Sequence, residues 1–169
     1  MVGTTILHFR ILEKLGEGSM GAVYKARDTR LDRDVALKFL APELTRDPDS
    51  KARFTREARA ASALQHENIC TIHDIEETED GQLFIVMDLY GGESLKEKIQ
   101  RGPLKVEEAT EFAIQIGQGL AEAHQHGVVH RDIKPANILI ARNRVVKVVD
   151  FGVAKLAGGT RMKSLTSNL

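Results

Sequence analysis

Three glycines fall within residues 16–21, GEGSMG, and give the chain its first pattern with a use in chemistry. Glycine has no side chain to block a close approach, so the backbone N–H groups of such a run can donate hydrogen bonds to phosphate oxygens. The run lies between two predicted strands, whereas a dinucleotide-binding fold places the same spacing before a helix. A tight hairpin without a ligand explains the three glycines equally well.

A lysine stands at the end of the apolar sequence VALK, residues 35–38, where a strand is predicted. An unpaired ammonium group is costly to bury, so Lys38 needs a partner. Glu57 is the candidate, because Ala61 and Leu64 follow it at helical spacing and direct its carboxylate toward a buried surface. In the alternative interpretation, Lys38 extends into solvent and Glu57 is an ordinary surface carboxylate.

Two further polar groups adjoin apolar runs in the second half of the chain. Residues 130–137, HRDIKPAN, form a dense polar stretch between two apolar strand sequences, where so much polarity is unusual. Asp150-Phe151-Gly152 follows the apolar run 145–149, which places a carboxylate at the end of a strand and beside a flexible glycine. This tripeptide alone indicates little about function, and it becomes informative only together with the other three motifs.

These side chains must be positioned by two different kinds of structure along the chain. The first half is typical of antiparallel strands, and its one helical pattern carries Phe54, Ala58 and Ala61 on a single stripe. Asp49 or Ser50 is the predicted N-cap of that helix. The elements predicted for this half are strands at 10–15, 22–26, 35–40, 69–75 and 83–87 and a helix at 50–64.

The second half, which follows Gly91 and Gly92, is predicted to be mainly helical. Helices are expected at 94–100 and 106–125, and Gly127 suits the C-terminal end of the longer one. Short apolar runs indicate strands at 128–130, 138–140 and 145–149. The face of the longer helix that we expect to be buried consists of Phe112, Ala113, Ile116, Leu120 and Ala123.

Length, charge and cysteine content limit the number of domains, the partners and the cellular location that we expect. A chain of 169 residues and 18.7 kDa is one domain or slightly more. Lysine and arginine number 24, as do aspartate and glutamate, so no excess positive charge is available to gather nucleic acid or anionic lipid. The single cysteine, Cys70, fits a reducing compartment, and no segment has the apolar run of a signal peptide or membrane helix. We therefore expect a cytoplasmic globular protein without a nucleic-acid partner.

Taken together and in this order, the four motifs resemble the eukaryotic-type protein kinase family. The signature of that family is a Gly-rich loop, a strand lysine, a His-Arg-Asp catalytic loop and Asp-Phe-Gly. The intervals are similar too, with 22 residues from Gly16 to Lys38, 19 from Lys38 to Glu57 and 18 from Asp132 to Asp150.

Lys134, two positions after Asp132, is similar to the serine/threonine branch, and the sequence IVM at 85–87 resembles the bacterial Hanks-type enzymes. The fold that the resemblance implies is α+β and protein kinase-like. It has a five-stranded antiparallel N-lobe with one helix, followed by an incomplete, mainly helical C-lobe. The implied boundaries are 9–90 for the N-lobe and 91–169 for the part of the C-lobe.

The resemblance implies a bilobal site for ATP with Mg²⁺. Lys38, held by Glu57, would contact the α- and β-phosphates, and Met87 matches the gatekeeper position. Residues 88–90 match the hinge, which offers backbone groups to the edge of the adenine. Apolar residues would sandwich the adenine ring: Leu15, Val23, Ala36 and Leu139. The full set implied in nucleotide binding is Leu15, Gly16, Gly18, Gly21, Val23, Ala36, Lys38, Met87, Asp88, Tyr90 and Leu139.

The implied reaction is transfer of the γ-phosphoryl group of ATP to a serine or threonine hydroxyl of a protein substrate. Asp132 would accept the hydroxyl proton, and Lys134 would neutralise charge on the transferred group. Asn137 and Asp150 would hold Mg²⁺, because hard cations prefer oxygen ligands beside phosphate oxygens. The implied catalytic residues are thus Asp132, Lys134, Lys38 and Glu57.

The match stops near the end of the chain, where 17 residues follow Gly152 without an Ala-Pro-Glu motif. We therefore expect a kinase domain truncated in the activation segment. Two alternatives stay open: a catalytically silent nucleotide-binding or interaction fragment, and a small-molecule kinase of related fold, which usually lacks Arg131 and Lys134. Four hydroxyls are candidate phosphorylation sites with Arg131 as partner, or else incidental: Thr160, Ser164, Thr166 and Ser167.

Overall fold

The computed structural model of the chain describes residues 1–18, 21–42 and 47–151. These residues form two compact units. The first unit contains the described residues of 1–56 and residues 72–89, and the second contains 57–71 and 90–151. Among the described helices, none combines the length and the apolar character needed to cross a membrane.

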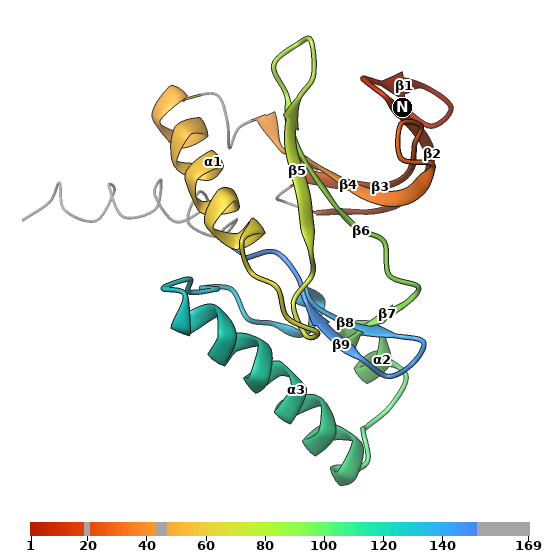
Figure 1. Ribbon diagram of the computed structural model, residues 1–169. Helices are drawn as coiled ribbons and strands as arrows, with labels where there is room; N and C mark the ends of the chain where they lie inside the picture. Colours follow the sequence, from red (N-terminus) through yellow and green to blue (C-terminus); the bar gives the residue numbers. More distant parts are fainter. Residues whose placement is uncertain (19–20, 43–46, 152–169) are drawn as a thin grey trace, which may run out of the picture. The chain divides into compact units, whose positions relative to one another are not determined.

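An antiparallel sheet forms the basis of the first unit (Figure 1). In the described residues it has six strands in the order β1-β2-β3-β4-β6-β5, one more than the five predicted. The additional strand is a two-residue edge strand, in which Thr5 and Ile6 pair with Arg10 and Phe9. The strands are β1 Thr5–Ile6, β2 Phe9–Gly18, β3 Gly21–Asp28, β4 Arg33–Leu40, β5 Ile72–Glu77 and β6 Leu83–Asp88.

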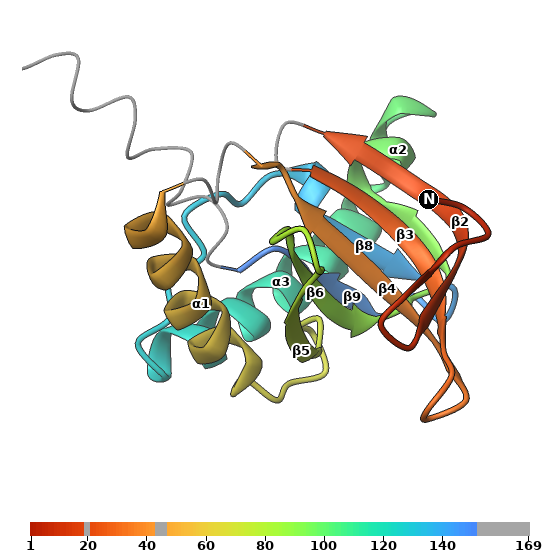
Figure 2. The same cartoon turned by 90° about the horizontal axis from the view of Figure 1, so that it is seen from above.

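Apolar side chains at alternate positions fill one face of this sheet, as the period of two along a strand requires. Phe39 and Phe84 stack with their ring centroids 4.9 Å apart. Strand β4 lies between β3 and β6, and Figure 2 shows it beside β3. Residues 35–40 of this central strand are all buried, which explains how Lys38 comes to be buried. The core on this face consists of Phe9, Ile11, Ala26, Val35, Leu37, Phe39, Phe84 and Val86.

Helix α1, Pro48–Ser62, begins two residues before the predicted start. The Asp47 carboxylate accepts hydrogen bonds from the backbone N–H and the hydroxyl of Ser50, both at 2.9 Å, so Asp47 is the N-cap. A cap at Asp49 or Ser50 was therefore wrong. The physical reason is Pro48, whose fixed φ and missing N–H suit the first helical position. The predicted apolar stripe is buried: Phe54, Ala58 and Ala61.

The second unit combines helices with a small antiparallel sheet of strand order β7-β8-β9. Helix α2 begins with a capping box, in which the Ser94 hydroxyl accepts from the Glu97 N–H and the Glu97 carboxylate accepts from the Ser94 N–H. Gly127 follows the end of α3 with φ 72°, in agreement with its predicted position. The elements are β7 Gly92–Ser94, α2 Leu95–Gln100, α3 Val106–Gln125, the 3₁₀ helix η2 Pro135–Asn137, β8 Ile138–Ala141 and β9 Val146–Val148.

Helix α3 buries or partly buries the predicted face except at one position, Ala113. Phe112, Gly119 and Ala123 are buried, whereas Ala113 is exposed. The buried residues follow one another at helical spacing, and position 113 lies about 100° around the helix from position 112. Ala113 was therefore wrongly assigned to the buried face, although Phe112 and Ala123 were assigned correctly.

The apolar run 69–75 was predicted as one strand, and the structure divides it. Strand β5 begins only at Ile72. Ile69 forms a parallel bridge with Val148 of β9, and the Cys70 N–H donates to the Val148 carbonyl at 2.9 Å. The first residues of the run therefore belong to the second unit, because their backbone partners come from β9.

Asn68 joins the same segment to α3. Its side-chain N–H₂ donates to Gln115 Oε1 and to the Val146 carbonyl, both at 3.0 Å. Gln115 Oε1 also accepts the Val146 N–H at 2.8 Å. Gly119 lies against Asn68 so closely that a Cβ at this glycine would be 2.9 Å from the Asn68 carbonyl oxygen. These contacts fix the segment that follows α1 against α3 and β9.

Candidate active site

His130 connects the predicted catalytic loop, residues 130–137, to the chain segment after β9. Its ring is almost completely buried, with Nδ1 accepting the Asp132 N–H at 3.2 Å and Nε2 lying 2.7 Å from the Val149 carbonyl oxygen. A carbonyl can only accept a hydrogen bond, so Nε2 is the donor to Val149 and Nδ1 is the acceptor from Asp132. The strand predicted at 128–130 was wrong. The Val128 N–H donates to the Ala123 carbonyl at the end of α3, and the His130 side chain bonds to residues 132 and 149.

Asp132 provides a carboxylate that two neighbouring side chains bind. Its Oδ2 accepts hydrogen bonds from Lys134 Nζ at 2.6 Å and from Asn137 Nδ2 at 3.1 Å. Asn137 Nδ2 also donates to the Asp132 backbone carbonyl at 2.9 Å. The 3₁₀ helix η2 turns the chain back at this point, so the structure brings Asp132, Lys134 and Asn137 together.

Opposing effects determine the pKa of Asp132. Burial raises the pKa, because the carboxylate loses water, but the hydrogen bond and the charge of Lys134 and the Asn137 amide together lower it more. The pKa of Asp132 therefore lies below its ordinary value of 3.8. At neutral pH Asp132 is ionised, and this is the form that can accept a hydroxyl proton.

Asp150 lies between Val149 and Phe151, and both of these residues contact the catalytic loop. On one side, the Val149 N–H donates to the Asn137 carbonyl at 3.0 Å, and the Val149 carbonyl accepts from His130. On the other side, the buried Phe151 ring packs edge-on against His130, with centroids 4.7 Å apart. Asp150 itself has φ 68°, a conformation that few residues other than glycine adopt. The backbone of Asp150 is thus held next to this loop from both directions.

Asn137 and Asp150 offer oxygen donors of the kind that Mg²⁺ prefers. The Asn137 side chain is buried, and its two bonds to Asp132 both use Nδ2. The amide oxygen Oδ1 takes no part in these bonds and suits a hard cation, as does the Asp150 carboxylate. The chemistry of this donor set therefore fits the metal that the motifs imply.

Lys38 and Glu57 belong to different units, and their predicted pairing stays a prediction. Lys38 is 5% exposed on β4, opposite Val23 of β3 and Ile85 of β6. In the second unit, the Glu57 carboxylate lies 3.4 Å from Arg131 Nη1. Glu57 is therefore in contact with the catalytic loop, through the arginine that precedes Asp132.

The glycine-rich run connects β2 to β3, where Gly18 pairs with Gly21 and residues 19–20 lie outside the described part. Gly21 has φ 126°, and a Cβ there would lie 1.8 Å from the Phe39 carbonyl oxygen, so the sheet itself requires this glycine. At Gly16 and Gly18 a Cβ would meet no described atom within 4 Å. The local packing therefore explains only the third glycine.

The remaining residues predicted to contact the nucleotide are distributed over both units. Ala36 and Met87 are register partners on β4 and β6, and Gly16 is the partner of Val23. Leu15 is 46% exposed on β2. The first unit contains Leu15, Val23, Ala36, Met87 and Asp88, and the second contains Tyr90 and Leu139.

Comparison with known proteins decides the family. The family model of the protein kinase domain matches residues 9–168. The chain belongs to the protein kinase family. The resemblance inferred from the four motifs is thereby confirmed, and the kinase-like α+β fold class is confirmed by solved structures.

Curated relatives of this kinase-family chain are serine/threonine-protein kinases of bacteria. PknB of Mycolicibacterium smegmatis is 44% identical over 156 residues, which cover 90% of this chain and 25% of PknB. PrkC of Bacillus subtilis is 44% identical over 162 residues, which cover 95% of this chain and 25% of PrkC. The chain therefore spans about a quarter of the length of these relatives.

The solved structures lead to the same family. The crystal structure of the PknI kinase domain of Mycobacterium tuberculosis matches with a TM-score of 0.82 and 32% sequence identity. The match covers 94% of this chain and 67% of that structure.

Two side chains that the motifs did not single out contact the predicted hinge of this kinase-family chain, residues 88–90. His73 Nε2 lies 2.7 Å from Asp88 Oδ1, and Lys147 Nζ lies 4.8 Å from the centroid of the Tyr90 ring. Neither contact has a local signal in the sequence, because the two partners of each contact lie far apart along the chain. Only the strand register and the fold bring them together.

Several predictions concern residues outside the described part of the chain. They are the glycine of the Asp-Phe-Gly motif, Gly152, and the four candidate phosphorylation sites Thr160, Ser164, Thr166 and Ser167.

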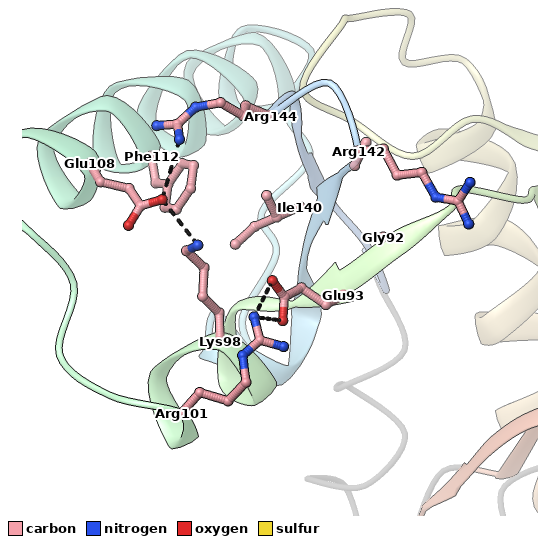
Figure 3. A pocket seen from close by; sticks show the side chains of 10 residues that line it. Gly92, Glu93, Lys98, Arg101, Glu108, Phe112, Ile140, Arg142 and Arg144 are labelled. Carbon is pink, nitrogen blue, oxygen red and sulfur yellow. Dashed lines mark hydrogen bonds and ion pairs between the residues drawn. The ribbon is translucent and has the colours of Figure 1, made fainter.

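A separate cavity of about 370 Å³ lies in the second unit (Figure 3). Glu93 and Arg101 pair on one wall, 2.6 Å apart, and Glu108 on another wall accepts from Lys98 at 3.0 Å and from Arg144 at 3.4 Å. None of the residues predicted for ATP, metal or catalysis lines this cavity. Arg142 lines the same cavity, so its charged lining consists of four cations and two carboxylates.

Proposed function

We propose that this chain provides ATP-binding and catalytic-loop residues of a serine/threonine protein kinase, which transfers the γ-phosphoryl group of ATP to a protein hydroxyl. The proposal rests on the hydrogen bonds that hold Asp132. Lys134 and Asn137 both donate to Oδ2 of its carboxylate, and its backbone N–H donates to the buried His130 ring. Residues 9–90 would form the N-lobe and residues 91–169 part of the C-lobe.

Asp132 would accept the proton of the substrate hydroxyl. Both side-chain hydrogen bonds reach Oδ2, so a hydroxyl can approach the carboxylate at Oδ1. Lys134 is half-exposed and lies within hydrogen-bond distance of the same carboxylate, so its positive charge would act next to the proton acceptor. This arrangement suits phosphoryl transfer, which depends mainly on positioning and electrostatic stabilisation.

The phosphates of ATP would lie against the glycine-rich hairpin and Lys38. Packing does not require glycine at Gly16 or Gly18, which supports a role for both in ligand approach. Lys38 would bind the α- and β-phosphates, and Asn137 and Asp150 would hold the metal. When bound, Mg²⁺ neutralises charge on the phosphate oxygens and orients them.

The adenine would be bound by apolar side chains and by the backbone of the hinge. The proposed contacts are Leu15, Val23, Ala36 and Leu139 on the ring faces, Met87 as gatekeeper, and the hinge residues Asp88 and Tyr90. Glu57 would position Lys38, in exchange with its present contact to Arg131. The proposal includes a cytoplasmic location, where ATP and Mg²⁺ are available, and a protein substrate with serine or threonine hydroxyls.

The test is phosphoryl transfer by the chain itself. Purified chain is incubated with ATP, Mg²⁺ and a serine- and threonine-rich protein, and mass spectrometry measures the phosphate gained by each protein. We expect transfer by the wild type and a loss of at least about 100-fold in Asp132→Asn and Lys38→Met, in the range of the effects of catalytic groups. Asp80→Asn, in an exposed turn, is the matched control and should keep the wild-type rate.

The outcomes separate the candidate functions. Nucleotide binding without transfer would favour the alternative of a catalytically silent nucleotide-binding fragment. Absence of nucleotide binding by the folded wild type would contradict both. Transfer that survives in Asp132→Asn would show that another group accepts the proton.

A further inference from the structure

His73 reaches the start of the hinge through an irregularity in the sheet. In the pairing of β5 with β6, Ile72 faces Met87 and Asp74 faces Val86, so His73 is an extra residue in a β-bulge. Bulges redirect side chains. Here the imidazole Nε2 lies 2.7 Å from the carboxylate of Asp88, the last residue of β6. Because a carboxylate only accepts, Nε2–H is the donor.

Lys147 reaches the other end of the hinge from β9. It is the register partner of Leu139 on β8, and its ammonium lies 4.8 Å from the centroid of the Tyr90 ring. This distance is within the range of a cation–π interaction, which attracts the ammonium to the face of the ring. Tyr90 is therefore held within the second unit, as Asp88 is held within the first.

We propose that His73 and Lys147 are positioning residues for the nucleotide-binding hinge, one at each end. The inference rests on the proposed function, in which the hinge binds adenine through its backbone. Backbone hydrogen bonds are sensitive to small displacements. The side chains of Asp88 and Tyr90 are engaged by His73 and Lys147, and these contacts fix the backbone that carries them.

The consequence concerns nucleotide affinity rather than the chemical step. Adenine contacts are the same before and during phosphoryl transfer, so loosening them weakens binding of the substrate and the transition state alike. Loss of either positioning residue should therefore raise the dissociation constant for ADP with Mg²⁺ and the KM for ATP, and leave kcat unchanged.

Four variants test this in the full chain. His73→Phe keeps a ring without the donor, and His73→Gln keeps an N–H₂ near the position of Nε2. Lys147→Met removes the charge, and Lys147→Arg keeps it. Calorimetric titration with Mg²⁺ and ADP should show binding about threefold to tenfold weaker in His73→Phe and Lys147→Met, and near wild-type binding in His73→Gln and Lys147→Arg.

Controls distinguish positioning from a structural effect. His126→Phe and Lys96→Met, at exposed sites on the second unit, should bind ADP as the wild type does. Thermal unfolding of every variant is followed by circular dichroism, and His73→Asn is the milder substitute if His73→Phe lowers the melting temperature strongly. In His73→Asn the amide is too short to reach Asp88, so affinity should again fall.

Two failures are distinguishable. If the folded wild type binds no nucleotide, the proposed function fails and this inference fails with it. If the wild type binds ADP and His73→Phe, His73→Asn and Lys147→Met bind it equally well, the positioning role is wrong while the proposed function stands. A fall in kcat at unchanged KM would also overturn it, because positioning of the adenine predicts the opposite pattern.

Discussion

At the scale of single residues, the ionisation of Asp132 depends on Lys134. Burial alone would raise the pKa of Asp132, and Lys134 is the main group that reverses this effect. We predict that Lys134→Gln raises the pKa of Asp132, because burial then acts against a weaker neutral hydrogen bond. The titration of the side-chain carboxyl carbon, followed by NMR between pH 2 and 7, measures the change.

The control for this prediction is Lys96→Gln, an exposed lysine on α2. It removes the same charge from the chain without touching Asp132, and the titration should stay at the wild-type position. An unchanged titration in Lys134→Gln would mean that the Lys134 contact does not set the ionisation of Asp132.

Asp28 shows the same balance at a structural position. Burial raises its pKa, but the backbone N–H groups of Leu31 and Arg30 and the charges of His8 and Arg33 bring the pKa below 3.8. A carboxyl whose pKa is lower in the folded state stabilises the fold above its unfolded pKa, and this contribution is lost as pH falls through the folded pKa. We predict that Asp28→Asn lowers the free energy of unfolding at pH 7 by about 1–2 kcal/mol.

The pH dependence of this difference in unfolding free energy tests whether the charge of Asp28 causes it. Urea unfolding at pH 7, 5 and 3 should show a difference between wild type and Asp28→Asn that is full at pH 7. The difference should begin to shrink near pH 3.8, where the unfolded chain takes up the proton, and be lost as the pH falls through the lower pKa of folded Asp28. Glu79→Gln, in an exposed turn, should differ little from the wild type at every pH. A difference for Asp28→Asn that stays constant with pH would exclude the charge as its cause.

At the scale of elements, two glycines of α3 should respond to alanine in opposite directions. Alanine favours helices over glycine by about 1 kcal/mol. At Gly117 a Cβ meets no described atom within 4 Å, so Gly117→Ala should stabilise the protein by up to about 1 kcal/mol. At Gly119 a Cβ would lie 2.9 Å from the Asn68 carbonyl, so Gly119→Ala should destabilise it despite the better propensity. Chemical denaturation of both variants measures this, and equal effects would show that the contact of α3 with Asn68 is not close.

The hairpin between β2 and β3 offers a second matched pair, Gly18 and Gly21, which are register partners. Gly21→Ala should lower the free energy of unfolding by at least about 1–3 kcal/mol, because its φ of 126° is strained for alanine and the Cβ would meet the Phe39 carbonyl. Gly18→Ala should leave stability nearly unchanged and weaken binding of Mg²⁺ and ADP. If Gly18→Ala were the less stable of the two, steric demand would not be what distinguishes these glycines.

The elements also show how far a sequence can be interpreted by itself. The strand alternation, the helix spacing and the four motifs are local, and most elements lie where these patterns indicated. The predicted N-cap was wrong because Pro48 occupies the first helical position, which makes Asp47 the cap. Ile69 was assigned to β5 because its bridge to Val148 is remote along the chain. The hydrogen bond of His73 to Asp88 depends on a bulge, which no local pattern reveals.

At the scale of the whole molecule, nucleotide and metal should act on stability together. A ligand that binds only the folded state stabilises it, by about 2.7 kcal/mol when its concentration is 100 times the dissociation constant. If Asn137 and Asp150 hold Mg²⁺ beside the phosphates, part of this stabilisation depends on the metal. The melting temperature of the chain with ADP should therefore be higher with Mg²⁺ than with the chelator EDTA.

Asp150→Asn tests whether the effect of Mg²⁺ on the melting temperature depends on the Asp150 carboxylate. The variant keeps one oxygen donor but loses the charge that a hard cation prefers, so its melting temperature with ADP should respond much less to EDTA than that of the wild type. Asp80→Asn removes the same charge from an exposed turn and should keep the full response. An equal response in wild type and Asp150→Asn would mean that Mg²⁺ acts through the nucleotide alone, and Asp150 would then have no part in holding the metal.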